Sequence, residues 1–134
     1  MRSDRRKVTP YGLSDGLPGT PSWNIINHGS EQQILPVCPM ASVPMVKGDE
    51  FIHIQAGAGG FGDPLEREPE KVLVDVLNEL ITSAYANDVY GVIIRDGEID
   101  FEATELRRLE LNKTGTAEET NMRYFFDAIN ISPI

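Results

Sequence analysis

Six consecutive residues, Gly57–Gly62, have the spacing of a nucleotide-binding motif. They read Gly-Ala-Gly-Gly-Phe-Gly and follow a stretch with strand character, so they formally contain the G-x-G-x-x-G pattern. That pattern binds a pyrophosphate only where a helix begins inside the loop and presents free N–H groups. Here Asp63 and Pro64 follow at once, and proline disfavours helical backbone at the residue before it. We therefore expect no NAD binding, and glycines that permit positive φ angles or the close approach of another backbone or a ligand.

Two histidines and the single cysteine, His28, His53 and Cys38, could in principle hold a zinc ion. They lack the close C-x-x-C or H-x-x-x-H pairs of zinc sites, and the sequence names no fourth ligand. Cys38 lies between Pro36 and Pro39 without a cationic neighbour that would lower its thiol pKa. We expect two ordinary histidines and a buried thiol, with zinc binding as the alternative.

Four acidic residues are close enough in sequence to suggest paired catalytic carboxylates. They also lie just before and within the first turn of a predicted helix, where negative charge stabilises the helix dipole, and we prefer that structural role. No Ser-His-Asp arrangement can be placed either, so we predict no catalytic residue on this chain. The four acidic residues are Asp63, Glu66, Glu68 and Glu70.

The elements that would position these residues differ between the two halves of the chain. Six of the nine prolines fall within residues 8–46, and proline lacks the N–H that a helix interior needs. Short extended segments separated by turns are therefore expected in residues 1–64, which end in the glycine loop. The predicted strands are residues 34–38, 41–46 and 51–55, the last from its alternation of side chains.

Helical spacing of apolar residues begins after Pro69, which can occupy the first position of a helix. Residues 65–134 are therefore expected to be mainly helical, and the fold class is predicted to be α+β. No flexible linker separates the halves, so residues 1–134 are predicted to form a single unit. Beyond the first helix the predictions are a helix at 83–88 capped by Ser83, a strand at 89–94, a turn at Asp96-Gly97, a helix at 101–111 capped by Asp100, a polar loop at 112–120 and an apolar tail at 124–134.

Composition excludes several classes of function. The chain has 134 residues and a formal net charge of -9, from 12 basic and 21 acidic residues, which argues against a nucleic-acid partner. One cysteine rules out an internal disulfide framework, and no apolar run is long enough for a membrane span. A basic stretch before Val8 is not followed by the apolar segment of a signal peptide, so a cytoplasmic protein is expected. That stretch is interpreted as a mobile terminus or as an arm for an acidic partner.

A series of short segments between about residues 5 and 110 shares its order with a known family. The most specific is the glycine loop that runs into Asp63-Pro64-Leu65-Glu66-Arg67. The others include Pro10-Tyr11-Gly12-Leu13, Asp15-Gly16-Leu17-Pro18-Gly19, Trp23-Asn24, Val46-Lys47-Gly48-Asp49 and Val89-Tyr90-Gly91-Val92. Together they resemble the C-terminal region of the hydantoinase B/oxoprolinase family. Family chains are much longer, Ala58 interrupts a glycine run that is usually unbroken, and residues from Asn112 onward have no match.

The resemblance implies a separate small subunit that completes the fold of a large hydantoinase B-like partner, as in an acetophenone carboxylase-type complex. In that family, hydantoinase A-like subunits bind ATP beside the hydantoinase B-like ones. The implied reaction is the ATP-dependent carboxylation of a ketone. Bicarbonate and the enol of the ketone are activated by phosphorylation and joined into a 3-oxo acid. ATP with Mg or Mn would lie on the partner subunits, and the isolated chain would be inactive.

Two other functions stay open. The chain could belong to an ATP-dependent hydantoinase or oxoprolinase, which hydrolyses a cyclic amide. It could instead be a stand-alone binding module without an enzyme partner. The resemblance alone does not separate the carboxylase from the hydrolase.

Two segments are the candidates for contact with a substrate cavity or a subunit interface. The alternative is that both are tight turns at an interface, and Phe61 is expected to pack as an anchor in a core or an interface. The candidate residues are Asp15, Gly16, Pro18, Gly19 and Trp23 in the first segment, and Gly57, Gly59, Gly60, Phe61, Gly62 and Asp63 in the second.

Overall fold

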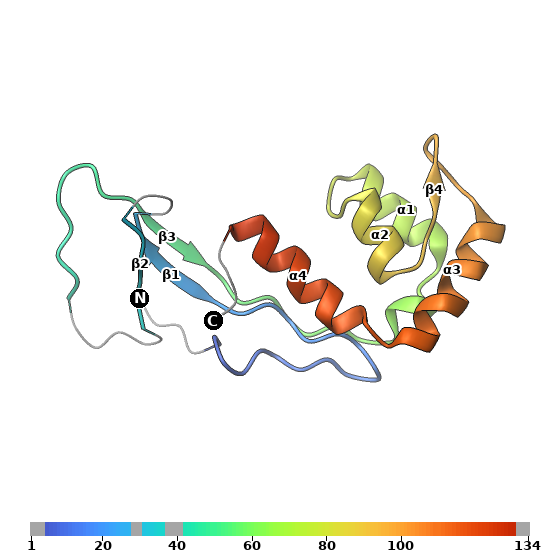
Figure 1. Ribbon diagram of the computed structural model, residues 1–134, viewed down its shortest axis with the longest axis horizontal. Coiled ribbons are helices and arrows are strands. Elements are labelled where there is room, and N and C mark those ends of the chain that lie inside the picture. Colours follow the sequence, from blue (N-terminus) through green and yellow to red (C-terminus); the bar gives the residue numbers. More distant parts are fainter. Residues whose placement is uncertain (1–4, 28–30, 37–41, 131–134) are drawn as a thin grey trace. The chain divides into compact units, whose positions relative to one another are not determined.

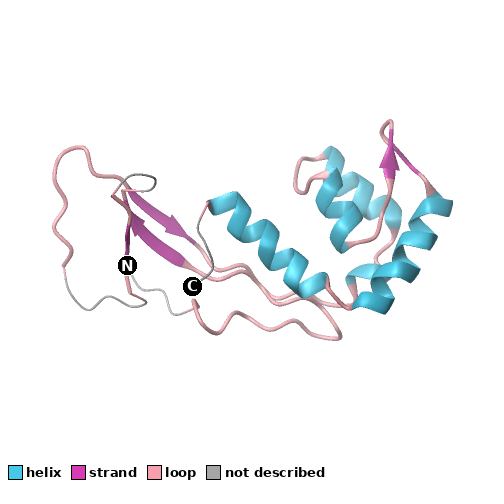
Figure 2. Cartoon of the chain, in the orientation of Figure 1, coloured by secondary structure: helices cyan, strands magenta, loops and turns pink. Residues whose placement is uncertain are grey.

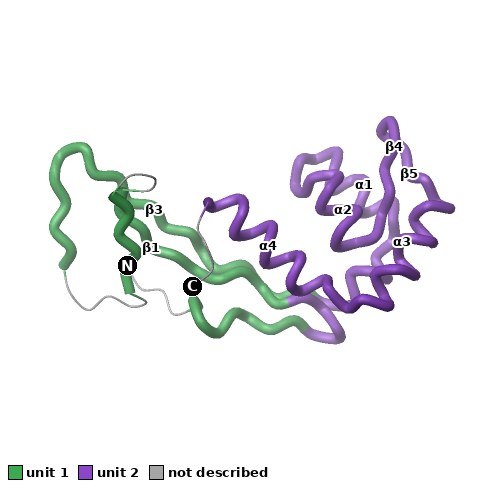
Figure 3. The backbone as a smooth tube through the Cα atoms, viewed as in Figure 1, with its two compact units in different colours: residues 1–12, 18–60 green, residues 13–17, 61–134 purple. Residues whose placement is uncertain are grey.

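The structure is a computed structural model that describes residues 5–27, 31–36 and 42–130 (Figure 1). Strands predominate in the first half of the chain and helices in the second, so the predicted α+β class is confirmed (Figure 2). The chain divides into two compact units, each built from two segments (Figure 3). Unit 1 comprises residues 1–12 and 18–60, and unit 2 comprises residues 13–17 and 61–134.

Unit 1 is built around a three-stranded antiparallel sheet. Its central strand β1 (Trp23–Ile26) pairs with β2 (Gln33–Ile34) on one side and with β3 (Phe51–Ile54) on the other. All four residues of β1 are buried, so this central strand is covered on both faces, to which its side chains alternately point. The predicted strand at 51–55 is confirmed, whereas β1 is a strand that the sequence pattern did not single out.

Two other strand predictions in this half are largely wrong over the residues described. Of the predicted 34–38 strand only Ile34 lies in β2. Leu35 N still donates to Asn24 O at 2.9 Å, but Pro36 has no N–H with which to continue the ladder. Residues 42–46 form no strand, and Val46 begins a turn in which its N–H donates to Asp49 Oδ2 at 2.8 Å. Residues 37–41 lie outside the described part of the chain.

Unit 2 contains the helices. After a short 3-10 turn η1 (Pro64–Glu66) come α1 (Pro69–Leu77) and α2 (Ser83–Val89), then a hairpin of β4 (Ile94–Arg95) and β5 (Glu98–Ile99). Helices α3 (Phe101–Thr114) and α4 (Ala117–Ile129) follow. The core of this unit is formed by Val72, Ala86 and Val92, against which Val76, Ile81, Tyr90, Ile94 and Ile99 pack.

Several boundaries in this half agree with the predictions. A helix begins at Pro69, the hairpin turns at Asp96-Gly97, and Asp100 caps α3 by accepting from Ala103 N at 2.9 Å. The cap of α2 is Thr82 and not Ser83, because the Thr82 hydroxyl accepts from Tyr85 N at 3.1 Å.

The predicted strand at 89–94 is largely wrong. Val89 ends α2, and the carbonyl of Ala86 accepts from both Tyr90 N and Val92 N. Gly91 makes this bend possible with a φ of +64°. The apolar run is therefore buried by a helix ending, and only Ile94 enters a strand.

The predicted loop at 112–120 is largely wrong, and the predicted apolar tail at 124–134 is helical over the residues described. Helix α3 continues to Thr114 and ends at Gly115, whose φ of +62° suits a helix C-terminus. Helix α4 takes the place of the tail as far as Ile129, and its Tyr124 ring meets the Tyr85 ring of α2 at 5.2 Å. Residues 131–134 lie outside the described part. Within that part, no helix has the length and apolar character of a membrane span.

Candidate functional site

The two segments singled out by the sequence are divided between the units, and each unit brings a part of one segment against a part of the other. In unit 1, Gly57 N donates to both the carbonyl and the hydroxyl oxygen of Thr20, each at 3.1 Å. Gly19 N donates in turn to Pro10 O at 2.8 Å. Three extended stretches of backbone are thus joined by hydrogen bonds, and all three belong to the unit drawn in green in Figure 3.

Side chains are excluded where these stretches cross. A Cβ on Gly19 would overlap the carbonyl of Gly57, and a Cβ on Gly59 would overlap the carbonyl of Tyr11. The close approach of another backbone, one of the two roles expected for the glycine loop, is therefore confirmed at Gly57 and Gly59. Gly60 is exposed, and Pro18 is partly buried in the same unit.

In unit 2 the carbonyl of Leu13 accepts two hydrogen bonds, from Gly16 N and from Gly62 N, each at 3.0 Å. Leu13 and Phe61 also form an isolated parallel bridge. Between Leu13 and Gly16 the chain turns through Ser14 and Asp15, whose φ angles of 51° and 65° are both in the left-handed region. The turn at Asp15-Gly16 is thus fixed to the end of the glycine loop, and Gly62 supplies the expected positive φ.

Phe61 does not pack in the core of its unit. Its side chain is 82% exposed, and that of its neighbour Leu13 is 57% exposed. The expectation of a core anchor is wrong, because the backbone bridge to Leu13 holds this segment at the surface. That Phe61 anchors an interface with another chain stays a prediction.

The predicted acidic cluster has structural partners. Asp63 Oδ1 accepts from Leu65 N at 2.8 Å and so caps η1, while Glu68 pairs with Lys71 at 3.0 Å at the start of α1. Glu70 lies in the first turn of that helix. The helix-dipole interpretation of these carboxylates therefore agrees with their positions.

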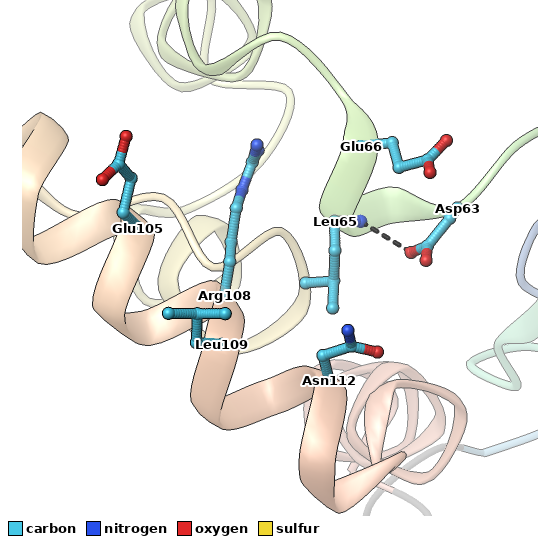
Figure 4. Close-up of a pocket in the computed structure, with 7 residues that line it drawn as sticks. All are labelled: Asp63, Leu65, Glu66, Glu105, Arg108, Leu109 and Asn112. Atoms are coloured by element: carbon cyan, nitrogen blue, oxygen red, sulfur yellow. Dashed lines mark hydrogen bonds between the residues drawn. The ribbon is translucent and has the colours of Figure 1, made fainter.

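A hollow of about 430 Å³ lies between η1 and α3 in unit 2 (Figure 4). Figure 4 draws the carboxylates of Glu66 and Glu105 at opposite sides of it. Arg108 donates through Nη2 to Arg67 O at 2.6 Å and through Nε to Tyr90 O at 3.1 Å. Burial lowers the pKa of Arg108, and the nearby Asp63 carboxylate opposes that shift. The lining residues are Asp63, Leu65, Glu66, Glu105, Arg108, Leu109 and Asn112.

The guanidinium in this hollow holds two backbone carbonyls in place, so its role is structural. Sequence reasoning missed the hollow because residues 63–66 meet 105–112 only after α3 has folded against η1. The predicted helix ended at residue 111, and a helix predicted to include Asn112 would have indicated the hollow.

Trp23 and Arg6 form a second partly buried cationic contact, in unit 1. Trp23 is 3% exposed in β1, and the Arg6 guanidinium lies 4.5 Å from the centre of its ring. Desolvation lowers the pKa of Arg6. Ser22 N donates to Arg5 O at 2.8 Å as well, so the interpretation of the basic stretch as a mobile terminus is wrong at these two residues.

Of the three residues considered for zinc, only His53 lies in the described part of the chain; His28 and Cys38 lie outside it. His53 Nδ1 is 2.7 Å from Oδ1 of Asn24, its cross-strand partner, which is 1% exposed. Because an amide oxygen only accepts, the proton of this bond is on Nδ1. Over residues 5–27, 31–36 and 42–130, no three His, Cys, Asp or Glu residues are grouped as a metal site requires.

Known proteins resemble this chain in sequence. Residues 1–64 match the family model of hydantoinase B/oxoprolinase. A protein of Pseudomonas sp. (strain NS671), named as the B subunit of a D-/L-hydantoinase, is 37% identical over 112 residues, which are 81% of this chain and 19% of that protein. The acetone carboxylase alpha subunit of Xanthobacter autotrophicus is 33% identical over 52% of this chain and 10% of its own length. The acetophenone carboxylase delta subunit of Aromatoleum aromaticum is 36% identical over 43% of this chain and 7% of its own length.

A solved structure resembles the chain in its fold. Nucleotide-free acetone carboxylase, from a study of ATP-dependent acetone carboxylation, superposes with a TM-score of 0.53 at 22% identity, over 81% of this chain and 19% of that one. This chain thus spans about a fifth or less of the length of these proteins. Most of the segments quoted for the family resemblance lie within residues 1–64, and the chain therefore contains a hydantoinase B-like region.

Proposed function

We propose that this chain is a small subunit of an ATP-dependent ketone carboxylase complex of the acetophenone carboxylase type. The observation that carries the proposal is that 81% of the chain corresponds to only 19% of a much longer hydantoinase subunit, with the same shares in the fold of acetone carboxylase. Two of the relatives are named as carboxylase subunits. The chain would supply one part of a hydantoinase B-like body whose larger part is on a partner.

The role of this subunit in the proposed complex is to complete and shape the substrate cavity. Support comes from the glycine segments, whose contacts with Thr20, Pro10 and Leu13 are made through backbone hydrogen bonds. Such contacts set the path of the chain and offer no acid, base or nucleophile. Catalysis and ATP binding with Mg or Mn are assigned to the partner subunits, and the isolated chain is expected to be inactive.

The proposed partners are a large hydantoinase B-like subunit and hydantoinase A-like subunits that bind ATP. Bicarbonate and the enol of the ketone would be phosphorylated there and joined into a 3-oxo acid. The complex is expected in the cytoplasm, where ATP is available, and residues 1–134 are expected to act as one unit when bound.

A second function is favoured by one observation. The relative that matches 81% of this chain is named as a hydantoinase subunit, which supports an ATP-dependent hydrolase of cyclic amides. Both functions use the same type of complex, so the substrate distinguishes them.

The test is purification of the tagged full chain from its native cell, with identification of companions by mass spectrometry. The purified complex is then assayed for ATP-dependent incorporation of labelled bicarbonate with acetophenone or acetone, and for ATP-dependent opening of a hydantoin. Incorporation of label supports the carboxylase, and hydantoin opening without bicarbonate replaces it with the hydrolase. Recovery of the chain as a monomer without a hydantoinase-like companion overturns both in favour of a stand-alone module.

A further inference from the structure

Two large apolar side chains stand next to each other on the surface of unit 2. Leu13 and Phe61 are brought together by their parallel bridge, and they are 57% and 82% exposed. Single exposed apolar residues are ordinary on protein surfaces, but this pair joins segments that are far apart in the sequence. The chance exposure of one side chain does not explain why two exposed apolar residues are held side by side.

The backbone beneath the pair is fixed. The carbonyl of Leu13 accepts from Gly16 N and Gly62 N, both at 3.0 Å, and so ties the two segments together. Ser14 and Asp15 both adopt left-handed φ angles, which non-glycine residues adopt at a cost. A surface that is held in one conformation before binding loses less entropy when a partner covers it.

We propose that Leu13 and Phe61 form a docking surface for an apolar depression on the large hydantoinase B-like partner. This inference rests on the proposed function and deepens it by naming the surface that meets the partner. Leucine and phenylalanine side chains offer no hydrogen bonds, so the surface that covers them must itself be apolar. An aromatic side chain in a closely fitting pocket is the usual energetic centre of such an interface.

The choice of partner follows from the extent of the matches. Both residues lie within residues 1–64, the part that matches the hydantoinase B/oxoprolinase family model. The alignment with the hydantoinase relative covers 81% of this chain but only 19% of that protein. A polypeptide that corresponds to the rest of the relative is therefore the partner expected to cover Leu13 and Phe61. A second copy of this chain is a poorer occupant, because two chains with a net charge of -9 repel each other.

The first experiment replaces Phe61 by the photoreactive amino acid p-benzoylphenylalanine in the full chain, expressed in its native cell. Irradiation is expected to link position 61 to a hydantoinase B-like polypeptide identified by mass spectrometry. The control is the same replacement at Phe101, which is 56% exposed in the same unit but lies outside the family match. Links from position 61 to a second copy, or links to the partner from position 101 only, overturn the proposal.

The second experiment measures the affinity of Phe61→Ser and Leu13→Ser variants for that purified hydantoinase B-like polypeptide. Loss of the Phe61 anchor is expected to raise Kd about 30-fold, while Phe101→Ser leaves Kd unchanged. If the wild-type chain binds and Phe61→Ser binds equally well, the docking surface is wrong and the subunit function stands. If the wild-type chain does not bind, the proposed function itself fails.

Discussion

At the scale of single residues, the glycines of the two joined segments act by lacking a side chain. Gly59 lies against the carbonyl of Tyr11 without room for a Cβ, whereas Gly62 has open space around it but a φ of +83°. The two residues thus illustrate two separate physical reasons for glycine within one loop.

Substitutions at these positions separate the two reasons. Gly59→Ala is expected to lower the free energy of unfolding by about 3 kcal/mol, because the backbone of residue 11 must move away. Gly62→Ala is expected to cost about 1 kcal/mol, from the left-handed φ alone. Urea unfolding of the full chain, followed by circular dichroism, measures both. A cost at Gly59 no larger than that at Gly62 would show that the segments are not packed as described.

Tyr85 has a strongly raised pKa. Burial and the nearby Tyr90 raise its pKa to about 12, and its hydroxyl donates to Asn121 Oδ1 at 2.6 Å. The folded chain therefore keeps this proton at pH values where the unfolded chain has lost it. The corresponding stability is fully present below pH 10, the ordinary pKa of tyrosine, and is lost as the pH rises toward 12.

We expect an alkaline titration, followed by tyrosinate absorbance, to contain a component near pH 12 from Tyr85. The Tyr85→Phe variant should lack that component. The Tyr11→Phe variant, which changes an 80% exposed side chain in the other unit, should retain it. Persistence of the late component in Tyr85→Phe would contradict the assignment.

At the scale of elements, α3 organises the helical unit through its first turn and its one buried polar residue. Asp100 caps the helix, and Thr104, which is 2% exposed, accepts from Ile93 N at 3.0 Å through its hydroxyl. The carbonyl of Ile93 accepts from Asp100 N at 2.9 Å. The backbone N–H and carbonyl of Ile93 are thereby both hydrogen-bonded, although Ile93 lies in no strand.

The cap is tested by Asp100→Ala and Asp100→Asn. We expect Asp100→Ala to cost about 1 kcal/mol of stability, because Ala103 N loses its acceptor. Asp100→Asn keeps an acceptor and gives up only the exposed ion pair with Arg95, so it should change stability by less than about 0.5 kcal/mol. Thermal or urea unfolding provides the comparison, and equal losses in both variants would exclude capping as the cause.

Thr104 provides a second test at this scale. Thr104→Val conserves the shape but leaves the N–H of Ile93 without its hydroxyl acceptor, and we expect a loss of about 2 kcal/mol. Thr104→Ser keeps the hydroxyl and removes one methyl group, so it should retain more stability. Hydrogen exchange at the Ile93 amide should accelerate in the valine variant only.

Helices and strands were predicted correctly from the sequence where a few neighbouring residues determine them. Pro69 at a helix start, the Asp100 cap and the alternation at 51–54 each depend on a few neighbouring residues, and each prediction is confirmed. The pattern failed where distant partners decide. β1 is a strand because β2 and β3 flank it, and the apolar run after Val89 is buried against α1 and α2 rather than by strand pairing. The site segments were found, but their division between two units depends on contacts that spacing does not encode.

At the scale of the whole molecule, the chain contains a hydantoinase B-like region and presents exposed apolar side chains in each unit. Val46 in unit 1 is 74% exposed, and Phe61 and Leu80 in unit 2 are 82% and 71% exposed. In an assembly these surfaces would be covered, so stability and partner binding should be linked.

Binding of the proposed hydantoinase B-like partner should therefore stabilise this chain. At a free partner concentration of 100 times Kd, linkage predicts a gain of about 2.7 kcal/mol in the free energy of unfolding. Hydrogen exchange of the full chain with and without the purified polypeptide measures the gain in protection. Phe101→Ser should show the same gain and Phe61→Ser a smaller one. Unchanged exchange with the partner present would count against assembly.

The carbonyl of Leu13 also sets an order of events during synthesis. It accepts from Gly16 N and from Gly62 N, so the turn at residues 13–16 gains its second hydrogen bond only after the chain as far as Gly62 has left the ribosome. A contact between such distant positions closes a long loop and forms later than local structure. The proposed partner would thus find this surface complete only after that length of chain has emerged, and its two apolar side chains would stay open to aggregation until they are covered.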